Sequence, residues 1–316
     1  MARRFYQRKR FWVPFLLLLP VLAFLVYLAL DPIPRFRRSV DRLLSLQGIE
    51  RKVLGQGRRA IIYYEGGPRD AKAVILLHGF GGNAQFTWMR LMPALAERYH
   101  VIAPDMLASN FLRLNPATYS VDSEVDQVLR LMDGIGVGRA DFVGLSVGGW
   151  VSLILALEHP EKVDRLVLVE SAGLTTEIPE LARLTLTDRE KARRFFELLF
   201  YSPPPLPGFV LDQMIRSSTR IKTQYEAVFM GLIENSKLRL LDDRVAEIQK
   251  PTLIIHGRQD RVIPLAVAER LHRLIPQSQM VVLEESGHAP VWDQPAKLKS
   301  AILEFLAANP VRGRND

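Results

Sequence analysis

Short apolar runs alternate with amphipathic stretches over most of the 316-residue chain. Runs of this kind predict strands buried on both faces of a sheet, and the stretches between them have helical spacing. The predicted strands are 60–65, 73–77, 100–103, 141–143, 165–169, 252–256 and 280–283. The predicted helices are 86–99, 121–134, 149–158, 265–274 and 295–308. This alternation is typical of an α/β protein, with a mostly parallel sheet and helices on both faces.

The alternation stops over residues 173–250, where no strand-like run occurs. The segment has a helical pattern with a proline-rich interruption at 202–208, and it carries apolar clusters at 195–196 and 198–201. We interpret it as a helical cap inserted between the sixth and seventh predicted strands. Most of its apolar residues are expected to pack on the sheet domain, and a part of them is a candidate lining for an acyl pocket or a lipid contact.

An uncharged run covers residues 11–30, and as a helix it would be about 30 Å long, enough to cross a bilayer. Trp12 and Tyr27 lie near its ends, where interfacial aromatic residues are expected. We predict an uncleaved transmembrane anchor here, between a basic flank at 1–10 and a charged amphipathic connector at 31–56. The alternatives are a buried core helix and a cleaved signal peptide, whose apolar region is usually shorter.

Charge is concentrated at this end of the chain. The net charge of the whole chain is +8, and residues 1–42 account for +7 of it, so the remainder is nearly neutral and no nucleic-acid partner is expected. Cations flank the apolar run on both sides with a slight excess before it, which favours a cytoplasmic N-terminus and an extracytoplasmic (periplasmic) main domain. The absence of cysteine from the sequence excludes disulfides, thiolate metal sites and cysteine nucleophiles.

The sequence GLSVG at residues 144–148 lies between a predicted strand and a predicted helix. In this position G-x-S-x-G predicts a nucleophile elbow, a sharp turn that exposes Ser146 Oγ. Glycines are needed beside the serine because the strained turn brings their backbone against a neighbouring strand and helix. The pattern alone is weak, since a chain of this length holds a chance match with a probability of about 0.1.

A second glycine-rich segment, HGFGG at residues 78–82, directly follows the predicted strand 73–77. Its backbone N–H groups could stabilise an oxyanion, and we predict Phe80 as one donor and Val147, the residue after the serine, as the other. The alternative is an ordinary glycine turn after a buried strand. His78 is expected to support this loop rather than to transfer protons.

An acid and a histidine follow the last two predicted strands. Asp260 comes after 252–256, in the kind of loop where open α/β sheets bind ligands, although a lone Asp is usually a cap or turn residue. Of the six histidines, only His288 follows the last predicted strand, 280–283, in a glycine-bearing loop. No histidine pair has metal-ligand spacing, so neither metal nor cofactor is expected. Glu170 is a less favoured alternative acid.

The chain order Ser146, Asp260, His288 is that of the α/β-hydrolase triad. The chain resembles this superfamily over roughly residues 58–306. The matching segments are HGFGG (78–82), APD (103–105), GLSVGG (144–149), EHPEKVDRLVLVESAG (158–173), PTLIIHGRQDRVIP (251–264) and SGHAPVWDQP (286–295). The anchor, the HGFGG loop and the cap are most similar to membrane-anchored monoacylglycerol lipases and related bacterial lipases.

The resemblance implies an α/β-hydrolase core at 57–172 and 251–310 that carries the cap at 173–250. It also implies a serine hydrolase that cleaves carboxylic esters through an acyl-enzyme, because haloalkane dehalogenases and most epoxide hydrolases of this fold have aspartate at the elbow. The anchor favours acylglycerol-like lipid esters. The alternatives are a carbon–carbon bond hydrolase with the same triad and a catalytically inactive binding protein.

Overall fold

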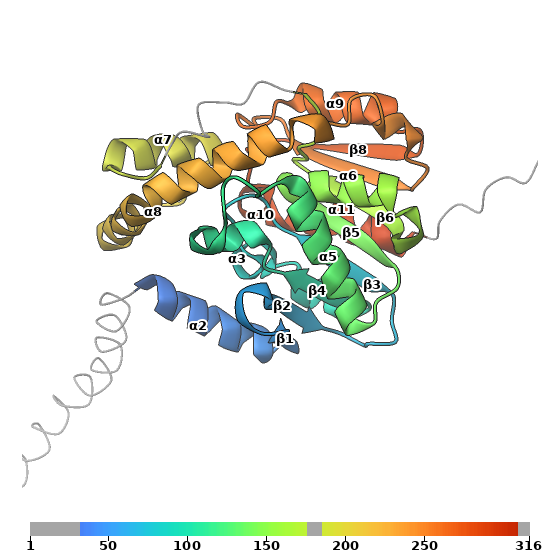
Figure 1. Cartoon of the computed structure of the whole chain (residues 1–316), viewed down its shortest axis with the longest axis horizontal. Helices are drawn as coiled ribbons and strands as arrows, with labels where there is room; N and C mark the ends of the chain where they lie inside the picture. The colour runs from blue at the N-terminus through green and yellow to red at the C-terminus, as the bar shows by residue number, and fades with distance from the viewer. Residues whose placement is uncertain (1–31, 176–184, 309–316) are drawn as a thin grey trace, which may run out of the picture.

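The computed structural model describes residues 32–175 and 185–308. Their centre is a sheet with the strand order β1-β2-β4-β3-β5-β6-β7-β8 (Figure 1). The strands are β1 (Ile49–Leu54), β2 (Ile61–Gly66), β3 (Ala73–Leu77), β4 (His100–Pro104), β5 (Ala140–Leu145), β6 (Val163–Val169), β7 (Thr252–Gly257) and β8 (Ser278–Leu283). β2 runs antiparallel to both of its neighbours, β1 and β4, and the other pairs are parallel. The mostly parallel sheet is therefore as predicted.

Helices cover both faces of the sheet (Figure 1). They are α2 (Pro32–Ser45), α3 (Ala84–Trp88), α4 (Met92–Ala96), α5 (Val121–Ile135), α6 (Val147–Glu158), α7 (Arg189–Leu199), α8 (Gly208–Asn235), α9 (Leu265–Leu274), α10 (Pro290–Asp293) and α11 (Pro295–Ala307). Alternate side chains of β3 point to opposite faces: Ile75 and Leu77 pack in one buried cluster with α5, α6 and α9, and Val74 and Leu76 pack in another with α2, α3, α4 and α11.

The strands differ from prediction mainly at the start of the sheet. All seven predicted strands are present, but residues 31–56, expected as a connector, contain α2 and the edge strand β1. β1 has the sequence IERKVL, in which three consecutive charged residues interrupt the apolar ones, so it shows no apolar run. Only five of the predicted strands precede the cap. With the unpredicted strand β1, six strands precede it, so the cap lies between the sixth and seventh strands of the sheet. The predicted helix 86–99 is two helices, α3 and α4.

The predicted membrane anchor at 11–30 lies outside the described residues. Within residues 32–175 and 185–308, no helix is both long and apolar enough to cross a membrane.

The cap follows β6 and contains α7 and the long helix α8, which lie side by side (Figure 1). The second half of α8 buries Val228 and Leu232 in the same cluster as α5 and α6. On the core segment before α5, the backbone carbonyls accept hydrogen bonds from α8: Gln224 Nε2 donates to Leu114 O (2.8 Å) and Asn235 Nδ2 to Tyr119 O (2.9 Å). The second half of α8 is therefore fixed to the core by both apolar and polar contacts.

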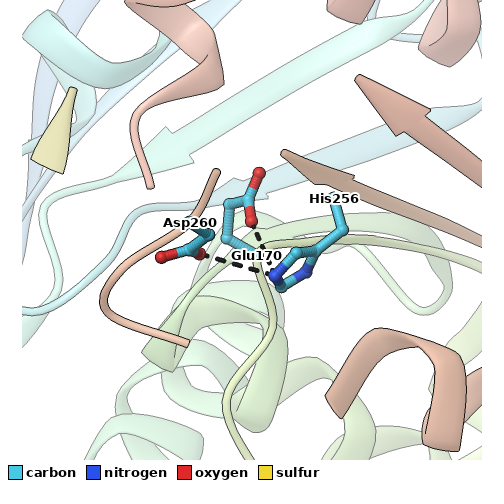
Figure 2. A group of neighbouring side chains, drawn as sticks. All are labelled: Glu170, His256 and Asp260. Carbon is cyan, nitrogen blue, oxygen red and sulfur yellow. Dashed lines mark ion pairs between the residues drawn. The ribbon is translucent and has the colours of Figure 1, made fainter. Parts of the chain in front are cut away.

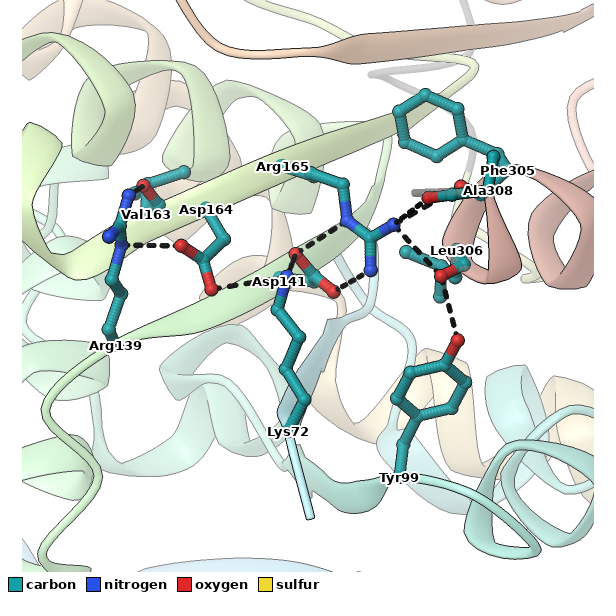
Figure 3. Close-up of polar contacts among 10 residues, drawn as sticks. All are labelled: Lys72, Tyr99, Arg139, Asp141, Val163, Asp164, Arg165, Phe305, Leu306 and Ala308. Carbon is teal, nitrogen blue, oxygen red and sulfur yellow. Dashed lines mark hydrogen bonds and ion pairs between the residues drawn. The ribbon is translucent and has the colours of Figure 1, made fainter. Parts of the chain in front are cut away.

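A buried ion pair joins the sheet to the last helix (Figure 3). Arg165 of β6 contacts Asp141 of β5 through two nitrogens, at 3.0 and 2.6 Å, and both side chains are buried. The remaining guanidinium nitrogen donates to carbonyls at the end of α11, including Leu306 O at 2.8 Å. Arg165 thus satisfies helix-terminal acceptors that have no partner within the helix. Lys72 adds a further contact to Asp141, at 3.0 Å.

We expect Arg165→Ala to lower the free energy of unfolding by about 3 kcal/mol, because it leaves Asp141 with one cation and exposes the helix end. Because Lys72 still pairs with Asp141 in this variant, the expected loss lies at the low end of the range for breaking a buried ion pair. The matched control is Arg139→Ala, whose side chain is 54% exposed and pairs with Asp164, with an expected loss below about 1 kcal/mol. Urea unfolding of both variants measures the difference, and equal losses would contradict this account.

Candidate active site

Ser146 occupies the turn between β5 and α6 in a conformation that side-chain-bearing residues rarely adopt, with φ 55° and ψ −117°. Hydrogen bonds hold this backbone on both sides. The Ser146 N–H donates to Val169 O (2.9 Å), and the Ser146 carbonyl accepts from the N–H groups of Gly149 (2.9 Å) and Ala172 (3.1 Å). The side chain is partly exposed although its neighbours are buried. The turn therefore presents a hydroxyl at the edge of the sheet.

The glycines beside Ser146 allow this turn because other backbone passes close to them. A Cβ at Gly144 would lie 2.3 Å from Gly148 O, and a Cβ at Gly148 would lie 2.3 Å from Leu77 O at the end of β3. No side chain fits at either position. The predicted steric reason for the G-x-S-x-G pattern is present in the structure.

The loop after β3 passes beside the serine. A Cβ at Gly79 would lie 3.1 Å from Ser146 Cβ. His78 holds this loop from inside: its Nε2 accepts from the Met106 N–H (2.9 Å), so its Nδ1 carries the proton and donates to Gly79 O (2.8 Å). Burial lowers the pKa of His78, which keeps the ring neutral. These contacts agree with the expected supporting role.

Phe80 connects the same loop to the cap. Its ring packs edge-on against Tyr225 and Phe229 of α8, with ring centroids 5.6 and 5.0 Å apart. Burial raises the pKa of Tyr225 to about 12, so it is a neutral phenol at physiological pH. α8 therefore places an aromatic cluster beside the loop that is expected to supply an oxyanion donor.

Asp260 and His288 are in direct contact. Asp260 Oδ2 lies 2.7 Å from His288 Nδ1, and its Oδ1 accepts from the N–H groups of Val262 (2.7 Å) and Ile263 (3.0 Å). Burial by itself would raise the pKa of Asp260, but the charge of His288 and the hydrogen bond from its ring outweigh burial and lower this pKa to about 2. Asp260 is therefore a carboxylate at neutral pH, oriented by two backbone donors.

The parallel strands bring these loops to the same edge of the sheet. Ser146 follows β5, Asp260 follows β7 and His288 follows β8, each at the carboxyl end of its strand. Among the hydrogen bonds of the described residues, none joins Ser146 Oγ to His288. Catalytic hydrogen bonds often tighten only when substrate is bound.

Glu170 and His256 extend the pair into a buried cluster (Figure 2). Glu170 directly follows β6 with a φ of 46°, its Oε1 accepts from the Gly257 N–H (2.7 Å), and its Oε2 lies 3.1 Å from His256 Nε2. Burial and the neighbouring charge of Asp260 raise the pKa of Glu170 well above its usual value. Glu170 is therefore a neutral acid, and the two carboxyl groups carry a single negative charge, on Asp260.

The same three side chains have possible ligand atoms within 4.8 Å of one another, which is a spacing that a metal ion could use. Most of the possible ligand atoms, however, already have partners, although the buried Glu170 Oε2 has no hydrogen-bond partner among the described residues. Asp260 Oδ2 contacts His288, Glu170 Oε1 accepts from Gly257, and His256 Nε2 lies 2.9 Å from Ile263 O. The arrangement is that of a hydrogen-bonded network rather than of a metal cage.

His256 is absent from the predicted site because it closes the predicted strand 252–256. A polar side chain at the end of a buried run, four residues before Asp260, was the signal that could have found it. The contacts of Tyr225 and Phe229 with the serine's loop were also missed, since no local pattern connects a cap helix to a loop more than a hundred residues earlier.

Comparison with known proteins identifies the class to which this fold and site belong. The family described as alpha/beta hydrolase fold matches residues 72–295. The chain therefore belongs to the alpha/beta hydrolase family, as its resemblance indicated.

Similar proteins within this family differ in activity. A 2-hydroxymuconate semialdehyde hydrolase of Pseudomonas sp. (strain CF600) is 30% identical over 82% of this chain and 94% of its own length. Monoacylglycerol lipase abhd6-B of Xenopus laevis is 26% identical over 92% of each chain. The crystal structure of a membrane phospholipase A, described as a bacterial virulence factor, superposes with a TM-score of 0.76 at 26% identity and covers 94% of this chain and 98% of its own. The family is thus shown, and the substrate is a separate question.

The neutral state of Glu170 predicts how stability depends on pH. Because its pKa is raised in the folded protein above the usual 4.5, the stability contributed by the protonated form is lost as pH rises through the folded-state pKa. Glu170→Gln mimics the neutral form at every pH. We expect the unfolding free energy of the variant to increase relative to that of the wild type as pH rises above about 4.5, measured by urea unfolding. Parallel curves over this range would contradict the assignment.

Proposed function

We propose that this protein is a serine hydrolase that cleaves carboxylic esters with Ser146 as nucleophile, His288 as general base and Asp260 as the orienting acid. The observation that carries the proposal is the 2.7 Å contact between Asp260 and His288 at the sheet edge where the strained Ser146 turn exposes its hydroxyl. This edge is where open α/β sheets bind ligands.

The chemistry follows from these positions. Ser146 Oγ attacks the ester carbonyl while His288 takes its proton, and Asp260 stabilises the imidazolium that forms. The backbone N–H groups of Phe80 and Val147 bind the oxyanion of the tetrahedral intermediate. His288 then protonates the leaving alcohol, and water releases the acyl group by the same steps. These reaction steps need no metal ion or organic cofactor.

Lipid esters are the proposed substrates. The uncharged run at 11–30 is a candidate anchor that would hold the enzyme beside membrane-derived substrates. Similarity to a monoacylglycerol lipase and to a membrane phospholipase A along most of the chain supports the same substrate class. The slight excess of cations before the run favours a periplasmic position of the hydrolase domain.

A carbon–carbon bond hydrolase is the second candidate. It is favoured by the 30% identity to a 2-hydroxymuconate semialdehyde hydrolase, and it would use the same serine, histidine and aspartate. A membrane anchor has no evident purpose for a soluble ring-cleavage product, so lipid ester hydrolysis ranks first. An inactive binding protein ranks last, because ligand binding alone does not require a strained serine or an oriented Asp–His pair.

The nucleophile and the acid can be tested together. A fluorophosphonate probe should label the wild type and fail to label Ser146→Ala. Asp260→Asn should lower kcat by roughly 10³- to 10⁴-fold because the orienting charge is lost, whereas Glu170→Gln, which keeps a neutral group in place, should change it by less than about threefold. Folded wild-type protein that the probe does not label would rule out a serine hydrolase. Equal losses of kcat in Asp260→Asn and Glu170→Gln would contradict the assignment of the acid role to Asp260.

The substrate class can be tested with a panel. The full chain in detergent should hydrolyse monoacylglycerol and long-chain p-nitrophenyl esters with a higher kcat/KM than p-nitrophenyl acetate, because α8 supplies apolar and aromatic surface beside the site. A 2-hydroxymuconate semialdehyde tests the second candidate in the same assay. A clear preference for acetate would contradict the lipid assignment, and turnover of the semialdehyde alone would establish the alternative.

A further inference from the structure

The end of α7 contacts both loops that carry the proposed Asp–His pair. In the Asp260 loop, Arg261 Nη1 donates to Glu197 O in the last turn of α7, at 2.8 Å. In the His288 loop, Gly287 lies against the residues that follow α7: a Cβ at Gly287 would be 2.8 Å from Leu199 O and 3.0 Å from Tyr201 N. The cap therefore meets the core beside each member of the pair, through the Arg261 side chain near Asp260 and through the Gly287 backbone near His288.

One carboxylate bridges the histidine loop and the cap. Asp293, the last residue of α10, accepts with its Oδ2 from the N–H of Gly287 (2.8 Å) and from the N–H of Tyr201 (2.9 Å). Its other oxygen is 3.5 Å from the N–H of Ser202. Hydrogen bonds to a charged acceptor are about twice as strong as those between neutral groups. Asp293 therefore fixes the residue next to His288 relative to the start of the α7–α8 connection.

The pair itself does not fix the position of the histidine backbone. Asp260 holds Nδ1 of the His288 ring, which orients the ring about one atom. The Cα position of His288 depends on its own loop, in which Glu285 has a positive φ of 56° and Gly287 has no side chain to pack. The loop is bonded to the Asp260 loop, where Gln259 Oε1 accepts from the Ser286 N–H (3.1 Å) and the Gln259 N–H donates to Ser286 O (3.0 Å). Asp293 joins it to the cap.

We propose that Asp293 is a positioning residue that couples the cap to catalysis: it sets the location of His288 relative to Ser146 by binding the histidine loop to the end of α7. The inference rests on the proposed serine-hydrolase function and adds a role for the cap beyond covering the substrate. A displacement of the α7 end moves Gly287 through the shared carboxylate, so a change in cap position changes the reach of His288. Asp293 itself need not touch substrate.

The test compares Asp293→Ala, Asp293→Asn and Asp242→Asn in the full chain. Asp242 is a matched control because it also accepts from a backbone N–H, that of Thr175 (2.9 Å), and also bonds cap to core, through Arg270 (2.6 Å), but it does so away from both loops. Each variant is measured for kcat and KM on a water-soluble p-nitrophenyl ester, for the rate of fluorophosphonate labelling, and for melting temperature.

We expect Asp293→Ala to lower kcat and the labelling rate by a similar factor, between about 10- and 100-fold, with KM changed less than about twofold, since small misplacements of a catalytic group have effects of this size. Asp293→Asn keeps an acceptor oxygen and should recover most of the labelling rate. Asp242→Asn should leave both rates within about twofold of the wild type.

Three results would overturn the inference: a change confined to KM, a loss of labelling in Asp242→Asn equal to that in Asp293→Ala, or full activity in Asp293→Ala. Melting temperatures close to that of the wild type exclude unfolding as the cause of a slow variant. Labelling of the wild type but not of Ser146→Ala supports the proposed serine-hydrolase function, whatever the Asp293 variants show. Failure of the Asp293 proposal can therefore be distinguished from failure of the proposed function.

Discussion

The close approach of three backbones around Ser146 is the constraint on which the site depends. β5, the first turn of α6 and the end of β3 meet so tightly that Gly144 and Gly148 have no room for a Cβ. The strained conformation of Ser146 persists because its N–H and carbonyl are bonded to backbone at the end of β6 and just beyond it, at Val169 and Ala172. The same packing brings the loop after β3 beside Ser146. One close contact therefore positions both the proposed nucleophile and its expected oxyanion donors.

The second constraint is the placement of one negative charge among buried groups. Two carboxyl groups and two histidines lie together at the ends of β6, β7 and β8, and both carboxylates could not be charged there without a large cost. Asp260 has two backbone donors and His288, whereas Glu170 has one backbone donor, from Gly257. The larger number of donors favours the charge on Asp260, which leaves Glu170 as a neutral member of the network.

Much of this could be predicted because the core strands are continuous apolar runs and because ligand-binding loops follow parallel strands. Ser146, Asp260 and His288 were selected by such positions, and the contact between the last two was predictable from their strands. β1 was missed because an exposed edge strand has no apolar run. The neutral state of Glu170 and the bridge made by Asp293 depend on distances between segments far apart in the chain, and no sequence spacing contains them.

The two helices of the cap contact different parts of the candidate site. α8 reaches the loop after β3 through Tyr225 and Phe229, so its side chains border the position where the acyl group would lie. The end of α7 contacts the Asp260 and His288 loops through backbone atoms, with Arg261 and Asp293 supplying the polar links. In the proposed mechanism, substitutions on α8 would therefore alter which substrates fit without disturbing proton transfer. The residues after α7 would be more restricted, because in our proposal their backbone positions determine the position of His288.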